Sequence, residues 1–168
     1  YARNFEEIDS VVTGPGNDFI TQLGRVDNSI WTGPGDDVVN PGIGGNVVYG
    51  GTGNDLCIVD WSEGDTPEMG GVYYNDAYRR QLAAAPFTQL DSLRLYEIER
   101  VHFTGTSKGD TLYGGSGNSV LLGRGGDDTL TGFDGDDLIE GNGGNDTIRG
   151  NTGNGPGGHD QLHGGDGD

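Results

Sequence analysis

The stretch GRGGDDTLTGFDGDDLIEGNGGNDTIR, residues 123–149, consists of three nine-residue units placed end to end. Each unit carries Asp at its sixth place and Leu or Ile at its eighth. A period of nine fits neither an α-helix nor the simple alternation of an amphipathic strand. Because turn-forming residues fill the first six places, each unit is predicted to form a turn followed by a three-residue strand.

The same frame extends in both directions and defines two blocks of units. The first block runs through 13–21, 23–31, 32–40, 41–49 and 50–58, with Gln22 as one extra residue. The second block runs through 105–113, 114–122, 123–131, 132–140 and 141–149. A sixth unit begins at Gly150 and is predicted to carry five extra residues, Gly155 to His159.

The eighth place is apolar in every unit, although apolar residues make up only 31% of the chain. Its members are Ile20, Ile30, Val39, Val48, Cys57, Leu112, Leu121, Leu130, Ile139, Ile148 and Leu162. A thin core fed by one side chain per unit is therefore predicted. Cys57 falls in this series, so we interpret it as a small buried hydrophobe and not as a nucleophile.

Composition excludes several classes of partner. The chain has 168 residues, 35 of them glycine, and a net charge of −18. Nucleic acids and anionic membranes are poor partners for such a surface, because phosphate binding needs clustered Lys and Arg. No apolar run approaches the roughly 18 residues of a membrane span. Metal cations are the natural counter-charge.

Three units carry a resemblance to a known family. GGTGNDLCI (50–58), GGSGNSVLL (114–122) and GNGGNDTIR (141–149) resemble the RTX, or hemolysin-type, nonapeptide GGxGxDxUx, a calcium-binding parallel β-helix repeat. The match departs at the first place in units 13 to 49 and at the second place in the second block. The resemblance implies calcium binding, export by a type I system and folding outside the cell.

The expected fold is all-β: a parallel β-roll, that is, a right-handed β-helix of nonapeptide repeats. Two units form one coil of 18 residues, and successive coils stack about 4.8 Å apart. The predicted organisation is a lead-in strand (1–12), a first roll block (13–58), an aromatic β-rich capping linker (59–104) and a second roll block (105–168). FEEIDSVVTG (5–14) resembles YEIERVHFTG (96–105), so the chain reads as two copies of one module.

The sixth place provides the candidate calcium ligands. Burying one apolar side chain per unit contributes roughly 1.5–3 kcal/mol, less than the ordering cost of nine residues at about 1–2 kcal/mol each. Stacked carboxylates about 5 Å apart add a repulsion of roughly 1–3 kcal/mol, which a dication between them would reverse. Calcium suits glycine-rich turns, because it accepts six to eight oxygens in flexible geometry. The predicted ligands are Asp18, Asp37, Asp55, Asp110, Asp128, Asp146, Asp137 and Asp160.

Stacking predicts strong and weak sites. The all-Asp series, Asp18–Asp37–Asp55 and Asp110–Asp128–Asp146, should bind several calcium ions. The series Ser119–Asp137–Asp160 should be weaker at its first step and distorted by the insertion at its last. Asn28 and Asn46 should form a weak or empty site.

Residues 59–104 interrupt the period. Residues 70–81 (GGVYYNDAYRRQ) read as a strand, and 81–87 (QLAAAPF) as a possible helical turn. The segment is also rich in aromatic residues. We expect these to form a small core of their own, with a sugar- or protein-binding face as the alternative: Trp61, Tyr73, Tyr74, Tyr78, Phe87, Tyr96 and Phe103. His159 and His163 lie on a glycine-rich loop, and zinc binding there is not favoured.

Three functions can be considered for such a chain. The favoured one is a calcium-dependent structural module of a secreted or cell-surface bacterial protein, such as an adhesin, surface layer or filament, which leaves self-association open. The alternative is the non-catalytic tail of a type I-secreted protease or lipase; neither HExxH nor GxSxG occurs in the chain. An ice-binding roll would need a rank of Thr at one turn position, and the third place has none. No catalytic constellation is visible, so no enzymatic activity is expected.

Overall fold

The computed structural model describes residues 2–5, 10–22, 27–62, 73–74, 93–151 and 157–167. Within these ranges the chain forms short strands and turns and no helix, and the strands pair in parallel. The prediction of an all-β parallel roll is therefore confirmed. The possible helical turn at 81–87 lies outside the described residues. No helix in the described ranges is long and apolar enough to cross a membrane.

The chain divides into two compact units, which are described separately. Unit 1 comprises Tyr1–Val59 and Gly70–Ile98, and unit 2 comprises Asp60–Met69 and Glu99–Asp168. The organisation proposed from the repeat frame, with boundaries after residues 12, 58 and 104, stays a prediction.

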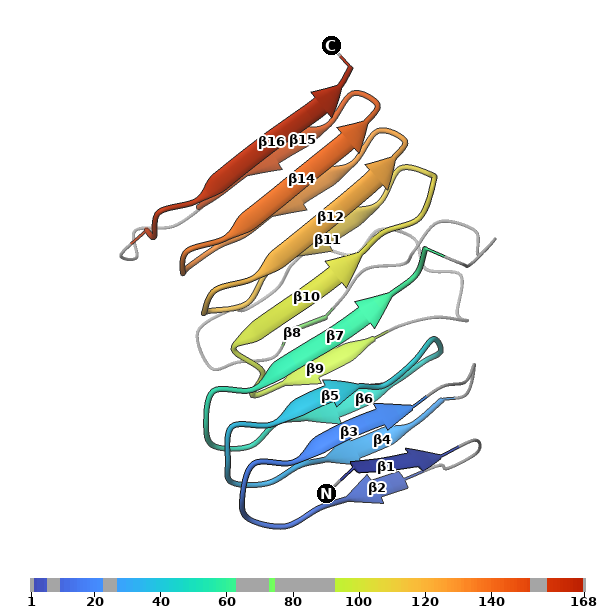
Figure 1. Ribbon diagram of the computed structural model, residues 1–168, viewed down its shortest axis with the longest axis vertical. Coiled ribbons are helices and arrows are strands. Elements are labelled where there is room, and N and C mark those ends of the chain that lie inside the picture. The colour runs from blue at the N-terminus through green and yellow to red at the C-terminus, as the bar shows by residue number, and fades with distance from the viewer. Residues whose placement is uncertain are drawn as a thin grey trace. The chain divides into compact units, whose positions relative to one another are not determined.

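Unit 1 stacks its coils so that alternate strands form two parallel sheets (Figure 1). One sheet contains, in order, β1 (Ala2–Phe5), β3 (Phe19–Gln22), β5 (Val38–Asn40) and β7 (Leu56–Asp60). The other contains β2 (Ser10–Val12), β4 (Ser29–Trp31), β6 (Val47–Tyr49), β9 (Arg94–Tyr96) and β8 (Tyr73–Tyr74).

Unit 2 repeats this arrangement with longer strands on one side. Its first sheet contains β10 (Arg100–Thr104), β12 (Val120–Gly125), β14 (Leu138–Gly143) and β16 (Gln161–Asp166). Its second contains β11 (Thr111–Tyr113), β13 (Thr129–Thr131) and β15 (Thr147–Arg149), which Figure 1 shows behind the first.

Strand register confirms the coil of two units. Val38 pairs with Leu56 and Thr129 pairs with Thr147, each 18 residues apart. Phe19 pairs with Val38 because the extra Gln22 lengthens that coil by one residue. Each coil therefore places its sixth and eighth residues directly over those of the preceding coil.

The eighth-place residues form the core of both units. From Ile20 through Ile139 they are at most 3% exposed. Leu162, on the last described strand, is 49% exposed. Cys57 is fully buried, and burial raises the pKa of its thiol, as the interpretation of a small buried hydrophobe requires.

The lead-in sequences contribute the same kind of core residue. Val11 pairs with Ile30 and Phe103 pairs with Leu121, so both stand in the eighth-place series although they precede the repeat blocks. Phe103 is fully buried and Val11 is 7% exposed. The lead-ins therefore contribute strands in register with the repeats.

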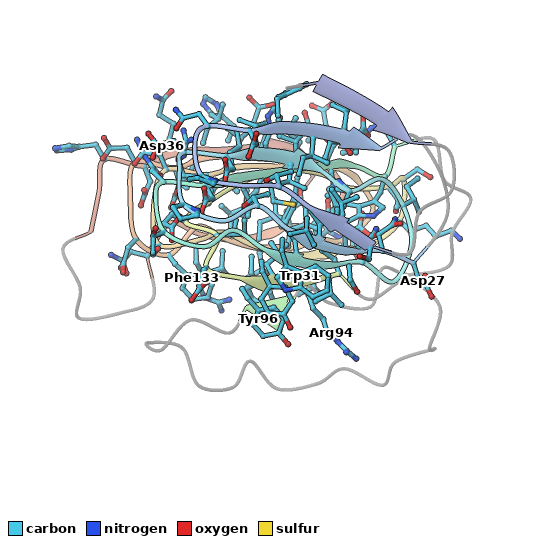
Figure 2. All side chains as sticks on the ribbon, turned by 90° about the horizontal axis from the view of Figure 1, so that it is seen from below. Asp27, Trp31, Asp36, Arg94, Tyr96 and Phe133 are labelled. Carbon is cyan, nitrogen blue, oxygen red and sulfur yellow. The ribbon has the colours of Figure 1, made fainter. Side chains whose placement is uncertain are left out.

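The prediction that the aromatic residues form a separate core is wrong for those that the structure describes. In unit 2, Trp61 packs on Phe103 with ring centroids 5.2 Å apart. In unit 1, Tyr96 continues a stack with Tyr49 and Trp31 on the outer face, at centroid distances of 4.5 and 5.4 Å (Figure 2). Tyr96 and Phe103 extend the two rolls because their strands take up the roll register. Tyr78, Phe87 and the side chains of Tyr73 and Tyr74 lie outside the described residues.

The five extra residues of the last unit are also placed differently from the prediction. The backbone N–H of His159 donates to Asp136 Oδ1, as the residue at the fifth place does in other coils, and Gly157 bridges to Gly135. His159 therefore occupies the fifth place of its unit. It is not an extra residue, which corrects the prediction of Gly155 to His159 at its last member.

Candidate metal centre

The sixth-place residues stack into columns joined by hydrogen bonds. In the first-block Asp column, the Asp18 N–H donates to Asp37 Oδ1 at 2.7 Å, and the Asp37 N–H donates to Asp55 Oδ1 at 2.9 Å. Each carboxylate thus caps the turn of the preceding coil. The stacking of these three residues, one coil apart, is as the sequence predicted.

Unit 2 contains two such columns. In the second-block Asp column, the N–H groups of Asp110 and Asp128 donate to Asp128 Oδ1 and Asp146 Oδ1 at 2.7 and 2.9 Å. In the mixed column, the N–H groups of Ser119 and Asp137 donate to Asp137 Oδ1 and Asp160 Oδ1 at 2.8 and 3.1 Å. The longer second bond spans the insertion, yet the column remains connected. All eight predicted ligand residues therefore lie in one of these three columns.

The carboxylates are buried with part of their bonding capacity unused. Asp37 is fully buried, and Asp110 and Asp128 are at most 2% exposed. Among the described residues, one oxygen of each of the following carboxylates is buried without a hydrogen-bond partner: Asp18, Asp37, Asp110, Asp128 and Asp146. A buried carboxylate oxygen without a partner is strongly unfavourable, so this pattern calls for a cation.

Burial also changes the proton affinity of the second-block Asp column. Burial raises the pKa of Asp128 to about 6. The hydrogen bond from the Asp110 N–H acts in the opposite direction and lowers the pKa. The negative charges of Asp110, Asp146 and Asp127 raise the Asp128 pKa further. Burial raises the pKa of Asp110 as well, opposed by hydrogen bonds from the Thr106 N–H and hydroxyl. Both shifts have the sign expected of carboxylates that lack a counter-charge.

Glycine at the first place leaves room for the carboxylate. A Cβ at Gly123, Gly132 or Gly141 would collide with Oδ2 of Asp128, Asp137 or Asp146 of the same unit, respectively. The structure thus explains the first-place glycines of the second block. It also shows that the turn backbone closely surrounds the acidic side chain.

The fifth-place residues also form columns, which the sequence analysis does not predict. The Asp36 N–H donates to Asn17 Oδ1 and the Asn54 N–H donates to Asp36 Oδ1, both at 3.0 Å. The same bonds join Asp136 to Asn118 and Asn145 to Asp127 in unit 2. These side chains are exposed, and their N–H bonds run in the opposite direction to those of the sixth place. Asn or Asp at eight of the eleven fifth places was the available signal.

The donor set fits a hard cation. Within the described residues no group of three or more His, Cys, Asp or Glu side chains is placed to hold a metal ion. A cation at the carboxylate columns would therefore draw oxygens from carboxylates and from backbone carbonyls of the turns. An all-oxygen set with few side-chain ligands suits calcium and disfavours zinc.

Comparison with known proteins agrees with this chemistry. A family model described as the RTX calcium-binding nonapeptide repeat (4 copies) matches residues 24–48, 40–56, 104–132, 131–154 and 155–168, more than half of the chain. No curated protein matches the sequence. The repeats of this family bind calcium and are typical of secreted bacterial proteins. The chain therefore belongs to the family of RTX calcium-binding nonapeptide-repeat proteins.

Proposed function

We propose that the chain is a calcium-dependent structural module of a secreted or cell-surface bacterial protein, without enzymatic activity of its own. The supporting observation is the set of buried carboxylate columns in which one oxygen of each of Asp18, Asp37, Asp128 and Asp146 has no hydrogen-bond partner. Calcium bound there would supply the positive charge that the stacked turns lack. Folding and ion binding are then one process.

The rest of the chain supports this coupling. Its thin core, high glycine content and net charge of −18 resemble the composition of disordered chains. In calcium-poor cytosol such a chain stays unfolded and suited to type I secretion. Outside the cell, calcium at millimolar concentration binds in the carboxylate columns and the chain folds.

The parent protein is proposed to be an adhesin, surface layer or filament, in which folded modules assemble in series. The alternative is the non-catalytic region of a secreted enzyme, with the same calcium chemistry in this chain. The flanking sequence discriminates between them, since an HExxH or GxSxG motif upstream would favour the enzyme.

The folding claim is tested by circular dichroism of the chain in chelator, in millimolar calcium and in millimolar magnesium. Fully ordered β structure is expected in calcium only, and in chelator any order should be local. Asp128→Ala removes a column carboxylate and should raise the calcium concentration at half-folding by about tenfold, equivalent to about 1.4 kcal/mol.

Asp127→Ala is the matched control. It removes the same charge from the neighbouring residue, which is exposed and accepts the Asn145 N–H in the fifth-place column. Its folding midpoint should move less than twofold. A chain that is fully ordered in chelator would refute the proposed function.

A further inference from the structure

Two uncharged sixth-place residues, Asn46 and Ser119, donate side-chain hydrogen bonds that an ionised Asp cannot donate. Asn46 Nδ2 donates to the backbone carbonyls of Gly42 and Gly44, each at 3.3 Å. Ser119 Oγ donates to the carbonyl of Gly117 at 3.1 Å. Gly44 and Gly117 both hold the fourth place of their turns. In two different coils, a neutral sixth residue thus donates a hydrogen bond to the carbonyl of the fourth residue of its own turn.

The Asn46 amide is bonded at both ends. Its Oδ1 accepts from the Asn28 N–H at 3.1 Å and from Asn28 Nδ2 at 2.8 Å. The first of these bonds is the one that Asp37 and Asp55 also make. Asn46 is 1% exposed and Asn28 is 2% exposed, so the pair forms a buried clasp between two coils.

An ionised Asp can make only half of these contacts. Its Oδ1 accepts the N–H of the preceding coil, as Asn46 Oδ1 does, but its second oxygen has no proton to donate. The buried second oxygens of Asp37 and Asp128 show the result, since neither has a hydrogen-bond partner. The buried second oxygen then has no donor, an arrangement that a dication would stabilise.

We propose that the sixth-place side chain decides, coil by coil, whether a turn closes with its own hydrogen bonds or requires a dication. Asn28 and Asn46 form a calcium-independent clasp in which the Asn46 amide group takes the place of the ion. The inference rests on the proposed function for the identity of the ion as calcium. It adds that the pattern of Asp and Asn sets how much of the roll depends on calcium.

The first test converts the clasp into an Asp pair. In the full chain, N28D/N46D should bind one more calcium ion than the parent, counted by equilibrium dialysis and elemental analysis at saturating calcium. Its backbone amide at residue 47, which donates to residue 28, should exchange at least tenfold faster than the parent's in chelator and recover in calcium. N17D/N54D is the control for charge, because it adds two carboxylates to the exposed fifth-place column.

The reciprocal test covers the case in which N28D/N46D does not fold. D37N/D55N should bind at least one ion fewer than the parent. In chelator, the amides of its β5 and β7 should be at least tenfold better protected than those of D37A/D55A, which lacks the amide donors.

Each outcome decides the inference. An additional bound calcium ion in N28D/N46D, with none in N17D/N54D, supports the inference. Equal gains of bound calcium in both variants would show that the number of ions follows net charge alone and would overturn it. Equal exchange in D37N/D55N and D37A/D55A also overturns it. A parent chain that binds no calcium contradicts the proposed function instead, while the comparison in chelator still tests the clasp.

Discussion

Cys57 offers a probe of folding at a single residue. It is the only cysteine in the chain, it is fully buried in the core of unit 1, and burial raises its thiol pKa. Because the thiolate is the reactive species, the folded chain should react with a thiol reagent at least a hundredfold more slowly in calcium than in chelator. The rate is measured by absorbance with an aromatic disulfide.

The control is a short cysteine peptide, whose reaction rate should be the same in both buffers. Equal protection of Cys57 in calcium and in chelator would show that this part of the core forms without the ion.

The raised pKa of Asp128 predicts the direction of the pH dependence. The folded-state pKa is about 6 and the ordinary value is 3.8, so without metal the folded state binds the proton more tightly than the unfolded state. This contribution to stability is fully present below about pH 4 and is lost as the pH rises through about 6. Metal-free protein should therefore gain ordered structure, measured by circular dichroism, as the pH falls from 7 to 4.

The stabilisation by calcium should have the opposite pH dependence and weaken as the pH falls, because protons compete with calcium for the same carboxylate. Melting curves at pH 7 and pH 5, each at a low and a high calcium concentration, should show the two midpoints converging as the pH falls. Asp128→Asn, which cannot titrate, should reduce the convergence. Midpoints that diverge on acidification would contradict the assignment.

At the scale of the turn, close stacking of coils restricts the fourth place. Gly35 has φ of +146°, and a Cβ there would collide with the backbone carbonyl of Gly16 in the preceding coil. Gly35→Ala should therefore destabilise the calcium-bound chain by about 1–3 kcal/mol, measured by denaturant unfolding.

Gly14→Ala is the matched control, since a Cβ at Gly14 would meet no atom within 4 Å. Its effect should remain within about 0.5 kcal/mol, as for an ordinary surface substitution. Similar losses for the two variants would argue against the close stacking of turns.

The repeat frame predicted the elements well because one residue type has one task at each place. The apolar eighth place gave the core and the acidic sixth place gave the columns, and the structure brings both together at the expected spacing. The insertion was misplaced because residues 150–158 are so rich in glycine that several alignments fit equally well. The hydrogen bond from the His159 N–H to Asp136 shows that His159 holds a regular place in its unit.

Contacts between coils could not be predicted from composition alone. The aromatic residues Trp61 and Phe103 were assigned to a separate core because they lie outside the periodic units, yet Phe103 pairs with Leu121 as a regular core residue. The fifth-place column was missed because exposed Asn and Asp are also ordinary turn residues. Their role in joining coils depends on the register of neighbouring turns.

At the scale of the whole molecule, stability should depend on ion binding more than on core burial. The chain carries 27 acidic and 9 basic residues, and several of its carboxylates lie in buried columns. Screening by monovalent salt weakens repulsion between exposed charges but has much less effect on buried pairs. Millimolar calcium is therefore expected to stabilise the fold, and molar sodium chloride is not.

The free energy of unfolding should rise linearly with the logarithm of calcium concentration above the binding midpoint. Each ion released on unfolding contributes about 1.4 kcal/mol per tenfold increase, so the slope gives the number of ions that hold the fold. Asp pairs stack in both blocks, and a slope of at least two ions is expected from denaturant titrations at several calcium concentrations. Sodium chloride at 0.5 M in chelator should not restore the fold, because a monovalent cation supplies too little charge for the stacked carboxylates of Asp37 and Asp128. A flat calcium dependence, or full recovery in sodium chloride, would mean that general screening of the −18 charge stabilises the roll instead of ions bound within it.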